Sequence, residues 1–143
     1  MANGKNPNRS QESQSNHDKM VRYIANDLQS RGYYVRADHI PWNNGKPDEI
    51  DGYIPDVTAS SQGQFLIFEI ETCPTYDDEH TRKQLTAFSN HSTTFIIVPN
   101  SCQRNNQSFD PVPEVKQCLR NWGLTSVRVG TCNPFNGEID YNK

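Results

Sequence analysis

The sequence predicts a single α/β domain in which helices cover a mixed β-sheet. Apolar residues recur at helical spacing in residues 17–31, and two apolar strand-like runs at residues 50–59 and 64–71 are separated by a polar turn. Helix-like and strand-like segments then alternate over residues 75–129. An antiparallel pair of strands followed by this alternation is typical of a mixed sheet, and 143 residues are enough for one hydrophobic core.

The first element expected is a helix over residues 17–31. Its apolar stripe consists of Met20, Val21, Ile24 and Leu28. Asn16 is a suitable N-cap, and Gly32 can end the helix in a left-handed conformation. Residues 1–16 are rich in Asn, Ser and Gln and contain no hydrophobic run, so we predict that they form a flexible N-terminal arm.

Three strands are expected next. Residues 33–37 form a short run of aromatic and β-branched residues, and residues 39–48 contain the Pro and Gly breakers of a loop. Residues 50–59 and 64–71 form two longer apolar runs. The polar residues 60–63 between these runs predict a hairpin.

The second half of the chain alternates helices with strands. Residues 75–90 are expected to form a helix that Thr75 can cap. Acidic residues in its first turn suit the helix dipole. After this helix we expect a strand over residues 93–98, a polar loop over 101–110, a helix over 111–122 and a strand over 124–129. Residues 17–131 are therefore expected to form the domain, and residues 132–143 a C-terminal tail.

Three carboxylates, those of Asp56, Glu69 and Glu71, stand at the ends of the two predicted hairpin strands. If the turn is centred between Ser61 and Gln62, Asp56 lies beside Glu69 in the antiparallel pair. Glu69 and Glu71 are two residues apart and share one face of their strand. Charged side chains are rarely buried unless they are paired or bind a metal, and ligation by oxygen alone favours a hard cation. The sequence therefore predicts a Mg²⁺ or Mn²⁺ site at the rim of the sheet.

The Pro55-Asp56 pair, followed by Glu69-Ile70-Glu71, resembles the motif of the PD-(D/E)xK nuclease superfamily. The expected order of elements is similar to the αβββαβ core of the restriction-endonuclease-like fold of that family, with a C-terminal helix and strand added. The resemblance implies that Asp56 and Glu69 hold a metal ion and that the main-chain carbonyl of Ile70 completes its coordination. Glu71 stands at the position where the family usually has lysine, and it is a further candidate ligand.

The resemblance implies metal-dependent hydrolysis of phosphodiester bonds, in which the ion polarises the scissile phosphate and lowers the pKa of a bound water. Glu71 could orient or deprotonate that water, or bind a second ion. Lys83, in the following helix, could neutralise charge on the phosphate, and Gln84 is a weaker candidate in the same neighbourhood. Members of this fold often draw one more group from the first helix. The residues available there are His17, Asp18 and Asp27, of which we select Asp18.

Three classes of function fit the motif. The favoured class is a metal-dependent DNA endonuclease of the restriction, repair or junction-resolving type, which the resemblance implies to act as a homodimer. The second is a nucleic-acid-binding module that has kept the fold and lost catalysis, because Glu71 replaces the usual lysine. The third is a nuclease that acts on RNA.

The charge distribution places the acidity where the metal site is expected. The net charge is −3, and residues 47–79 contain nine acidic residues and no Lys or Arg. Residues 80–131 contain six basic residues against two acidic ones. Non-specific DNA binding scales with the number of phosphates neutralised, so we expect modest and salt-sensitive affinity for DNA.

The composition also restricts the environment of the protein. No apolar run approaches the ~20 residues needed to span a bilayer, so no membrane partner is expected. The N-terminus lacks the hydrophobic core of a secretory signal. The four cysteines, Cys73, Cys102, Cys118 and Cys132, form no Cys-x-x-Cys pair and have no histidine at zinc-ligand spacing, so we predict reduced thiols in a cytoplasmic protein.

Overall fold

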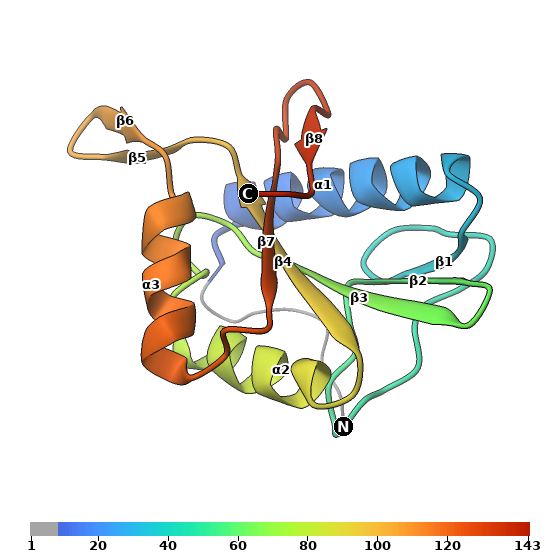
Figure 1. The fold of residues 1–143 in the computed structure, drawn as a ribbon. Coiled ribbons are helices and arrows are strands. Elements are labelled where there is room, and N and C mark those ends of the chain that lie inside the picture. Colours follow the sequence, from blue (N-terminus) through green and yellow to red (C-terminus); the bar gives the residue numbers. More distant parts are fainter. Residues whose placement is uncertain (1–8) are drawn as a thin grey trace.

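The structure is a computed structural model that describes residues 9–143 (Figure 1). Its elements are α1 (Gln11–Ser30), β1 (Tyr34–Ala37), β2 (Val57–Ser61), β3 (Gln64–Ile70), α2 (Glu79–Ser89), β4 (Thr93–Pro99), β5 (Cys102–Arg104), β6 (Gln107–Phe109), α3 (Val112–Trp122), β7 (Arg128–Cys132) and β8 (Ile139–Asp140). This order confirms the predicted α/β fold. Within the described part of the chain, no helix is long and apolar enough to cross a membrane.

The main sheet is mixed, as predicted. Within residues 9–143 it has six strands in the order β1-β2-β3-β4-β7-β8. Neighbours are antiparallel from β1 to β3, parallel from β3 through β4 to β7, and antiparallel again between β7 and β8. Parallel neighbours require a crossover, and α2 and α3 provide the two crossovers. The element order α1-β1-β2-β3-α2-β4 is the predicted αβββαβ arrangement.

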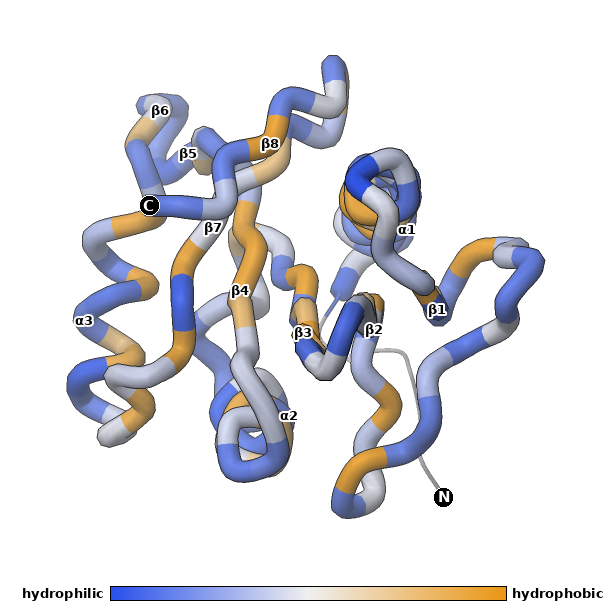
Figure 2. Tube along the Cα trace, turned by 45° about the vertical axis from the view of Figure 1, so that its right-hand side comes forward, coloured by the Kyte–Doolittle hydropathy of each residue, from blue (hydrophilic) through white to orange (hydrophobic). Residues whose placement is uncertain are grey.

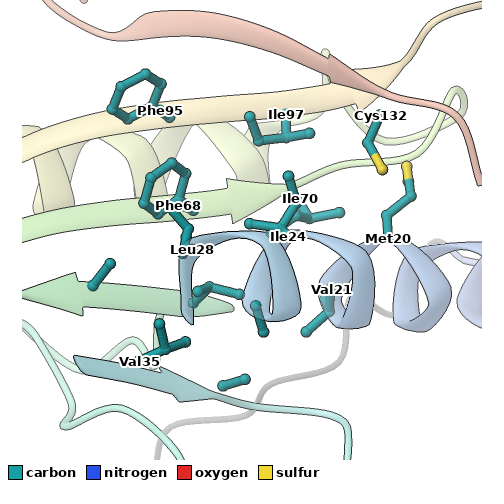
Figure 3. Packing of buried hydrophobic residues seen from close by; sticks show 14 of the residues in the cluster. Met20, Val21, Ile24, Leu28, Val35, Phe68, Ile70, Phe95, Ile97 and Cys132 are labelled. Atoms are coloured by element: carbon teal, nitrogen blue, oxygen red, sulfur yellow. The ribbon is translucent and has the colours of Figure 1, made fainter. Parts of the chain in front are cut away.

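Helices cover both faces of the sheet, and alternate side chains of β3 pack against them. Ile70 packs against Met20 and Ile24 of α1 on one face (Figure 3). Ile67 packs with Phe88 of α2 on the other face. In Figure 2 the central strand β4 is coloured mostly as hydrophobic, whereas the outer loops are largely hydrophilic. Strands of the centre of the sheet that are apolar on both faces are therefore covered on both sides.

The β2–β3 hairpin brings the motif residues together. Gln62 (φ 45°) and Gly63 (φ 82°) form its two-residue turn, and two successive positive φ angles are typical of a type I′ turn. The turn is centred one residue later than predicted. The register nevertheless places Asp56, one residue before β2, beside Glu69, so the expected neighbourhood of these two acids is correct.

The predicted strand over residues 50–59 is wrong in its first half. Residues 50–53 form a turn in which Asp51 (φ 51°) and Gly52 (φ 89°) adopt left-handed conformations. Ile50 and Tyr53 pair across this turn through an isolated β-bridge. The chain can enter the sheet only after the turn, at Val57.

The first helix begins six residues earlier than predicted. Its N-cap is Ser10, whose hydroxyl accepts the backbone N–H of Ser13 at 3.1 Å, so the predicted Asn16 cap is wrong. Residues 11–16 therefore belong to the helix and not to a flexible arm. Residues 1–8 of the predicted arm lie outside the described residues.

The second helix begins later than predicted. Asp78 is its N-cap and accepts the backbone N–H of Thr81 at 2.9 Å. The predicted cap, Thr75, lies in the turn before α2, where its hydroxyl donates to Glu71 at 2.7 Å. The cap prediction was wrong because the Thr75 hydroxyl is hydrogen-bonded to Glu71 and not to the first turn of the helix.

The predicted polar loop over residues 101–110 contains a two-stranded hairpin, β5–β6. Its turn is formed by Asn105 and Asn106, both with positive φ (54° and 62°), which asparagine tolerates better than most residues. The helix that follows, α3, agrees with the prediction to within one residue. Alternation of apolar residues is too short in β5 and β6 to be recognised in the sequence.

The end of the chain differs from the prediction. The predicted strand over residues 124–129 is displaced, because Gly123 ends α3 at φ 71° and the N–H of Val127 closes a turn onto the carbonyl of Leu124 at 3.1 Å. Strand β7 begins only at Arg128. The predicted tail over residues 132–143 instead contains β8, which pairs with β7.

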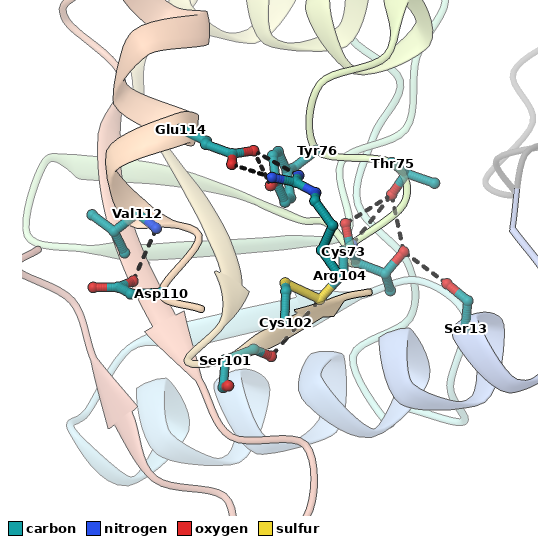
Figure 4. Close-up of a disulfide and its surroundings, with 11 residues drawn as sticks. Ser13, Cys73, Thr75, Tyr76, Ser101, Cys102, Arg104, Asp110, Val112 and Glu114 are labelled. Carbon is teal, nitrogen blue, oxygen red and sulfur yellow. Dashed lines mark hydrogen bonds and ion pairs between the residues drawn. A yellow bond between two sulfur atoms is a disulfide. The ribbon is translucent and has the colours of Figure 1, made fainter. Parts of the chain in front are cut away.

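Two of the four cysteines form a disulfide, so the prediction of reduced thiols is wrong for them (Figure 4). Cys73, in the segment after β3, is bonded to Cys102 of β5, with their Cα atoms 5.8 Å apart. Cys118 and Cys132 are free. Because disulfides persist mainly in oxidising compartments, this bond counts against a cytoplasmic location, which stays a prediction.

A polar network is a second attachment of the β5–β6 hairpin, in addition to the disulfide (Figure 4). Arg104 of β5 donates to both carboxylate oxygens of Glu114 in α3, at 2.7 and 3.1 Å, and the hydroxyl of Tyr76 donates to the same carboxylate at 2.8 Å. The hydrogen bonds from Arg104 and Tyr76 lower the pKa of Glu114 to about 2. The β5–β6 hairpin is therefore tied to the segment that follows Glu71 by one covalent and one polar link.

Replacing both Cys73 and Cys102 with serine is expected to lower the free energy of unfolding by about 3–4 kcal/mol. The disulfide closes a loop across 29 positions and restricts the unfolded chain accordingly. Urea unfolding of the variant and of the unreduced wild type measures the difference. Cys118→Ser is the matched control, since this cysteine is free and half-buried, and its effect should be much smaller. Equal stability of the wild type with and without reductant would contradict the prediction.

Candidate metal centre

The three predicted carboxylates are buried and lie close enough to affect one another's pKa, but among the described residues their oxygens do not form a group within 4.8 Å of one another. Asp56, Glu69 and Glu71 have exposed fractions of 3%, 2% and 0%. The Oδ2 atom of Asp56 accepts the backbone N–H of Ile70 at 2.8 Å, which fixes this carboxylate across the end of β3. Among the described residues, Oε1 of Glu69 and Oε2 of Glu71 have no hydrogen-bond partner. Buried charged oxygens without partners are costly, so the cluster has spare capacity to bind a cation.

The pKa values of the three acids are shifted in different directions. Burial and the nearby charges of Asp56 and Glu71 raise the pKa of Glu69 well above its usual range. Burial also raises the pKa of Glu71, although Arg9 opposes the effect. Burial alone would raise the pKa of Asp56 too, but its histidine neighbours outweigh burial and hold that pKa well below its usual range. Asp56 is thus the permanently charged member of the cluster.

Two histidines flank Asp56 that the sequence analysis did not select. Nε2 of His17, on α1, lies 3.2 Å from Oδ2 of Asp56, and Nε2 of His39, in the loop after β1, lies 3.2 Å from Oδ1. The two rings meet edge to face with centroids 4.7 Å apart. Both Nε2 atoms are within ion-pair distance of Asp56, yet neither forms an aligned hydrogen bond. The three groups together could hold a metal ion, since their ligand atoms all lie within 4.8 Å of one another.

Backbone placement explains how these histidines reach the site. His17 lies on the buried side of α1, three residues before Met20 of the apolar stripe. His39 adopts φ 71°, and its N–H donates to the side chain of Asp38 at 2.9 Å. The N–H of Asp38 in turn donates to the carbonyl of Asp56 at 2.9 Å. The loop after β1 is therefore hydrogen-bonded directly to the residue that carries the central carboxylate.

Without a metal, His17 balances the charge of Asp56. Burial disfavours the imidazolium form of His17, but the charge of Asp56 at 3.2 Å and the hydrogen bond to Asp18 outweigh burial and raise the pKa of His17 to about 9. The Arg9 charge acts in the opposite direction. At neutral pH the metal-free site therefore contains a buried ion pair between His17 and Asp56.

Arg9 supplies a second positive charge. One of its guanidinium nitrogens donates to Oε1 of Glu71 at 3.1 Å and to the carbonyl of Ile70 at 3.2 Å. Thr75 donates to the same Glu71 oxygen, and its hydroxyl also lies 3.0 Å from that of Thr72. The Ile70 carbonyl, predicted to be a metal ligand, is therefore hydrogen-bonded to Arg9.

The structure places the three further predicted site residues in different surroundings. Lys83 lies on the exposed side of α2, where its charge acts on Glu79 and not on the cluster, so the structure does not bring it to the site. Gln84 is buried on the side of α2 that faces the sheet. Asp18 joins the site indirectly, because its Oδ1 lies 2.9 Å from Nδ1 of His17.

The sequence could have indicated only one of the three site residues that it did not identify. His17 falls on the apolar stripe of its helix, and a titratable residue on a buried stripe was a usable signal. His39 lies in a loop rich in breakers, and Arg9 lies in the predicted arm. No local pattern marks either of them as a site residue, since only the tertiary fold brings them to Asp56 and Glu71.

A comparison with models of known protein families and with curated proteins found no match. The assignment of chemistry therefore depends on the geometry of the site and on the motif in the sequence.

The stability of the metal-free protein is expected to fall as the pH rises from 6.5 to about 9. His17 holds its proton up to a pKa of about 9 in the folded state but only up to 6.5 in the unfolded chain. Between these values the folded state binds the extra proton, so rising pH favours unfolding, by at most ~3 kcal/mol in total. Urea unfolding in EDTA across this range measures the effect. His17→Gln should flatten the profile, and a wild-type stability that rises with pH would contradict the assignment.

Proposed function

We propose that this protein is a nuclease that hydrolyses phosphodiester bonds in DNA and uses Mg²⁺ or Mn²⁺. The observation that carries the proposal is the burial of three carboxylates near the adjoining ends of β2 and β3, where Glu69 experiences the charges of the other two and two of the three have oxygens without partners among residues 9–143. Carboxylate and carbonyl oxygens are the ligands that these hard cations prefer. The Pro55-Asp56 and Glu69-Ile70-Glu71 spacing, within an αβββαβ order of elements, supports the same conclusion.

The residues divide the chemistry between them. Asp56 and Glu69, with the Ile70 carbonyl, would hold the ion, which when bound polarises the phosphate and acidifies a water molecule. The Ile70 N–H holds Asp56 in a fixed orientation. Glu71 would accept the proton of the attacking water, because burial raises its pKa and makes it a stronger base.

Arg9 takes the place of the cation that the family usually supplies as lysine. Its guanidinium lies beside Glu71, the residue at the lysine position, whereas Lys83 is exposed on α2. A fixed positive charge there would stabilise the negative charge that develops on the phosphate. Arginine suits this role because it stays protonated and binds phosphate oxygens through paired N–H groups.

One observation favours the second candidate function, a nucleic-acid-binding module without catalysis. The Arg9 guanidinium donates to the Ile70 carbonyl and to Glu71, two of the oxygens that a metal ion would need. If Arg9 keeps these bonds when DNA is present, a metal ion cannot bind at these oxygens. The protein would then bind nucleic acid without cleaving it. Metal-dependent cleavage separates the two candidates.

The test is cleavage of supercoiled plasmid by purified protein in Mg²⁺, in Mn²⁺ and in EDTA. Nicked or linear product in either metal but not in EDTA is expected, and branched duplex, single-stranded DNA and RNA substrates identify the preferred nucleic acid. Absence of cleavage on all of them, while nucleic acid is bound, would reject the nuclease and favour the binding module. A homodimer is part of the proposal, and light scattering coupled to gel filtration measures it.

A further inference from the structure

We propose that His17, His39 and Asp56 form a binding site for one transition-metal ion of the Zn²⁺ or Co²⁺ type, distinct in ligand chemistry from the all-oxygen site proposed above. The new site shares Asp56 with that site but does not depend on nuclease activity. It also gives His17, His39 and Asp18 roles in the molecule that the proposed nuclease mechanism leaves unassigned.

The spacing of the ligand atoms matches a metal centre. Each histidine Nε2 lies 3.2 Å from one Asp56 oxygen. Two ligands bound at about 2.1 Å to one ion stand roughly 3.0 Å apart in octahedral and 3.4 Å apart in tetrahedral geometry. Each nitrogen-to-oxygen separation falls between these two values, the two nitrogens approach different oxygens of Asp56, and one ligand atom from each residue lies within 4.8 Å of the others. A metal ion could therefore bind with small adjustments of the side chains.

The two nitrogens are buried and lack aligned partners. The side chains of His17 and His39 are 0% and 3% exposed. Neither Nε2 atom has a hydrogen-bond partner among residues 9–143. Buried polar atoms are nearly always hydrogen-bonded, so a pair of such nitrogens on either side of one carboxylate requires an explanation. A metal ion that accepts both lone pairs supplies it.

The partner of His17 orients it as metal-binding histidines are oriented. Oδ1 of Asp18 lies 2.9 Å from Nδ1 of His17, and Gln14 donates to the same oxygen at 2.9 Å. A carboxylate on Nδ1 favours the tautomer with its proton there and leaves the Nε2 lone pair facing Asp56. The arrangement of carboxylate, histidine and ligand position is the one that supports zinc sites.

The ligand set decides which metals fit. Imidazole nitrogens suit zinc, cobalt and other first-row transition metals, whereas Mg²⁺ prefers oxygen. Three protein ligands leave at least one position for water, as in catalytic rather than structural zinc sites. The side chains of Asp18 and His39 also line a surface groove of about 580 Å³ beside α1, which gives an ion a path to the site.

The experiment is a titration of EDTA-treated, tag-free full-length protein with Co²⁺, followed by its visible d–d absorption. One Co²⁺ per chain is expected, displaced by Zn²⁺ but not by a large excess of Mg²⁺. His39→Ala should weaken binding more than the ~10- to 100-fold loss typical of residues that only orient a ligand, and Asp18→Asn should fall within that smaller range. Far-UV circular dichroism verifies that each variant is folded.

The chain offers matched controls. His80 and His91 are the remaining histidines, and His80→Ala and His91→Ala should bind Co²⁺ as the wild type does. Glu49→Gln should also keep Co²⁺ binding, because Glu49 is exposed and belongs to neither site. Absence of the absorption band, retention of full affinity in His39→Ala, or equal competition by Mg²⁺ would overturn the proposal. Cleavage with Mg²⁺ but no Co²⁺ binding would reject this site alone, and Co²⁺ binding without any cleavage would reject the nuclease alone.

Discussion

Asp56→Asn is expected to lower metal-dependent DNA cleavage by about 10³-fold or more, which corresponds to roughly 4 kcal/mol of transition-state stabilisation. Asparagine has nearly the same shape and can still accept the Ile70 N–H, but it lacks the negative charge that a divalent cation requires. Asp56 is also the acid whose pKa the neighbouring histidines keep lowest, so it is the ligand that is charged at any working pH. Rates measured under single-turnover conditions with excess protein give the comparison.

The control for this prediction is the other Pro-Asp pair of the chain. Asp48 follows Pro47, its side chain is 94% exposed, and its partner is Arg36 at the surface. Asp48→Asn should cleave DNA at close to the wild-type rate. The Asp56 variant should also lose about 3 kcal/mol of stability without metal, because it leaves the buried His17 charge without its partner. Activity must therefore be compared at equal folded fraction, and a cleavage rate within tenfold of the wild type would contradict the assignment of Asp56.

Glu69→Gln is expected to stabilise the metal-free protein near neutral pH while abolishing its metal-dependent cleavage. The Glu69 carboxylate is buried beside Asp56 and Glu71, and a pKa raised well above the usual range means that its ionised form destabilises the fold. Glutamine removes that charge, and its amide can donate to the neighbouring carboxylates. We expect a gain of about 1–2 kcal/mol in the free energy of unfolding, as is common when a strained functional group is replaced.

Urea unfolding in EDTA and a cleavage assay on the same preparation measure the two effects of this change. Glu49→Gln is the matched control, because Glu49 is exposed, and its effect on stability should lie within about 0.5 kcal/mol. The stabilisation of the wild type by Mn²⁺ should be reduced in the Glu69 variant, since one of its ligands is lost. A Glu69→Gln protein that is less stable than the wild type, or that cleaves DNA normally, would show that Glu69 is an ordinary structural residue.

Local patterns in the sequence determined most of the architecture. Helix α3 was located to within one residue, with a proline near its predicted start, and the structure shows that Pro111 and Gly123 bound it through their own backbone conformation. The hairpin and its acids were located because a short polar turn between two apolar runs restricts the register over a short distance. The convergence of Asp56 and Glu69 follows from that register alone.

The three-dimensional fold decided which other groups complete the site. The disulfide between Cys73 and Cys102, the pairing of β8 with β7, and the approach of Arg9 to Glu71 all join segments that are far apart in the chain. His39 reaches Asp56 only because the loop after β1 is hydrogen-bonded to it.

The sequence by itself thus determined the helices α1 to α3, the order of the strands β1 to β4 and β7, and the acidic motif, because these features are specified by residues close together in the chain. The tertiary structure decided that these acids are buried beside two histidines and one arginine, because contacts between distant segments depend on the packing of the whole domain. Burial then sets the pKa values and the ligand chemistry of the site, which no pattern of neighbouring residues encodes.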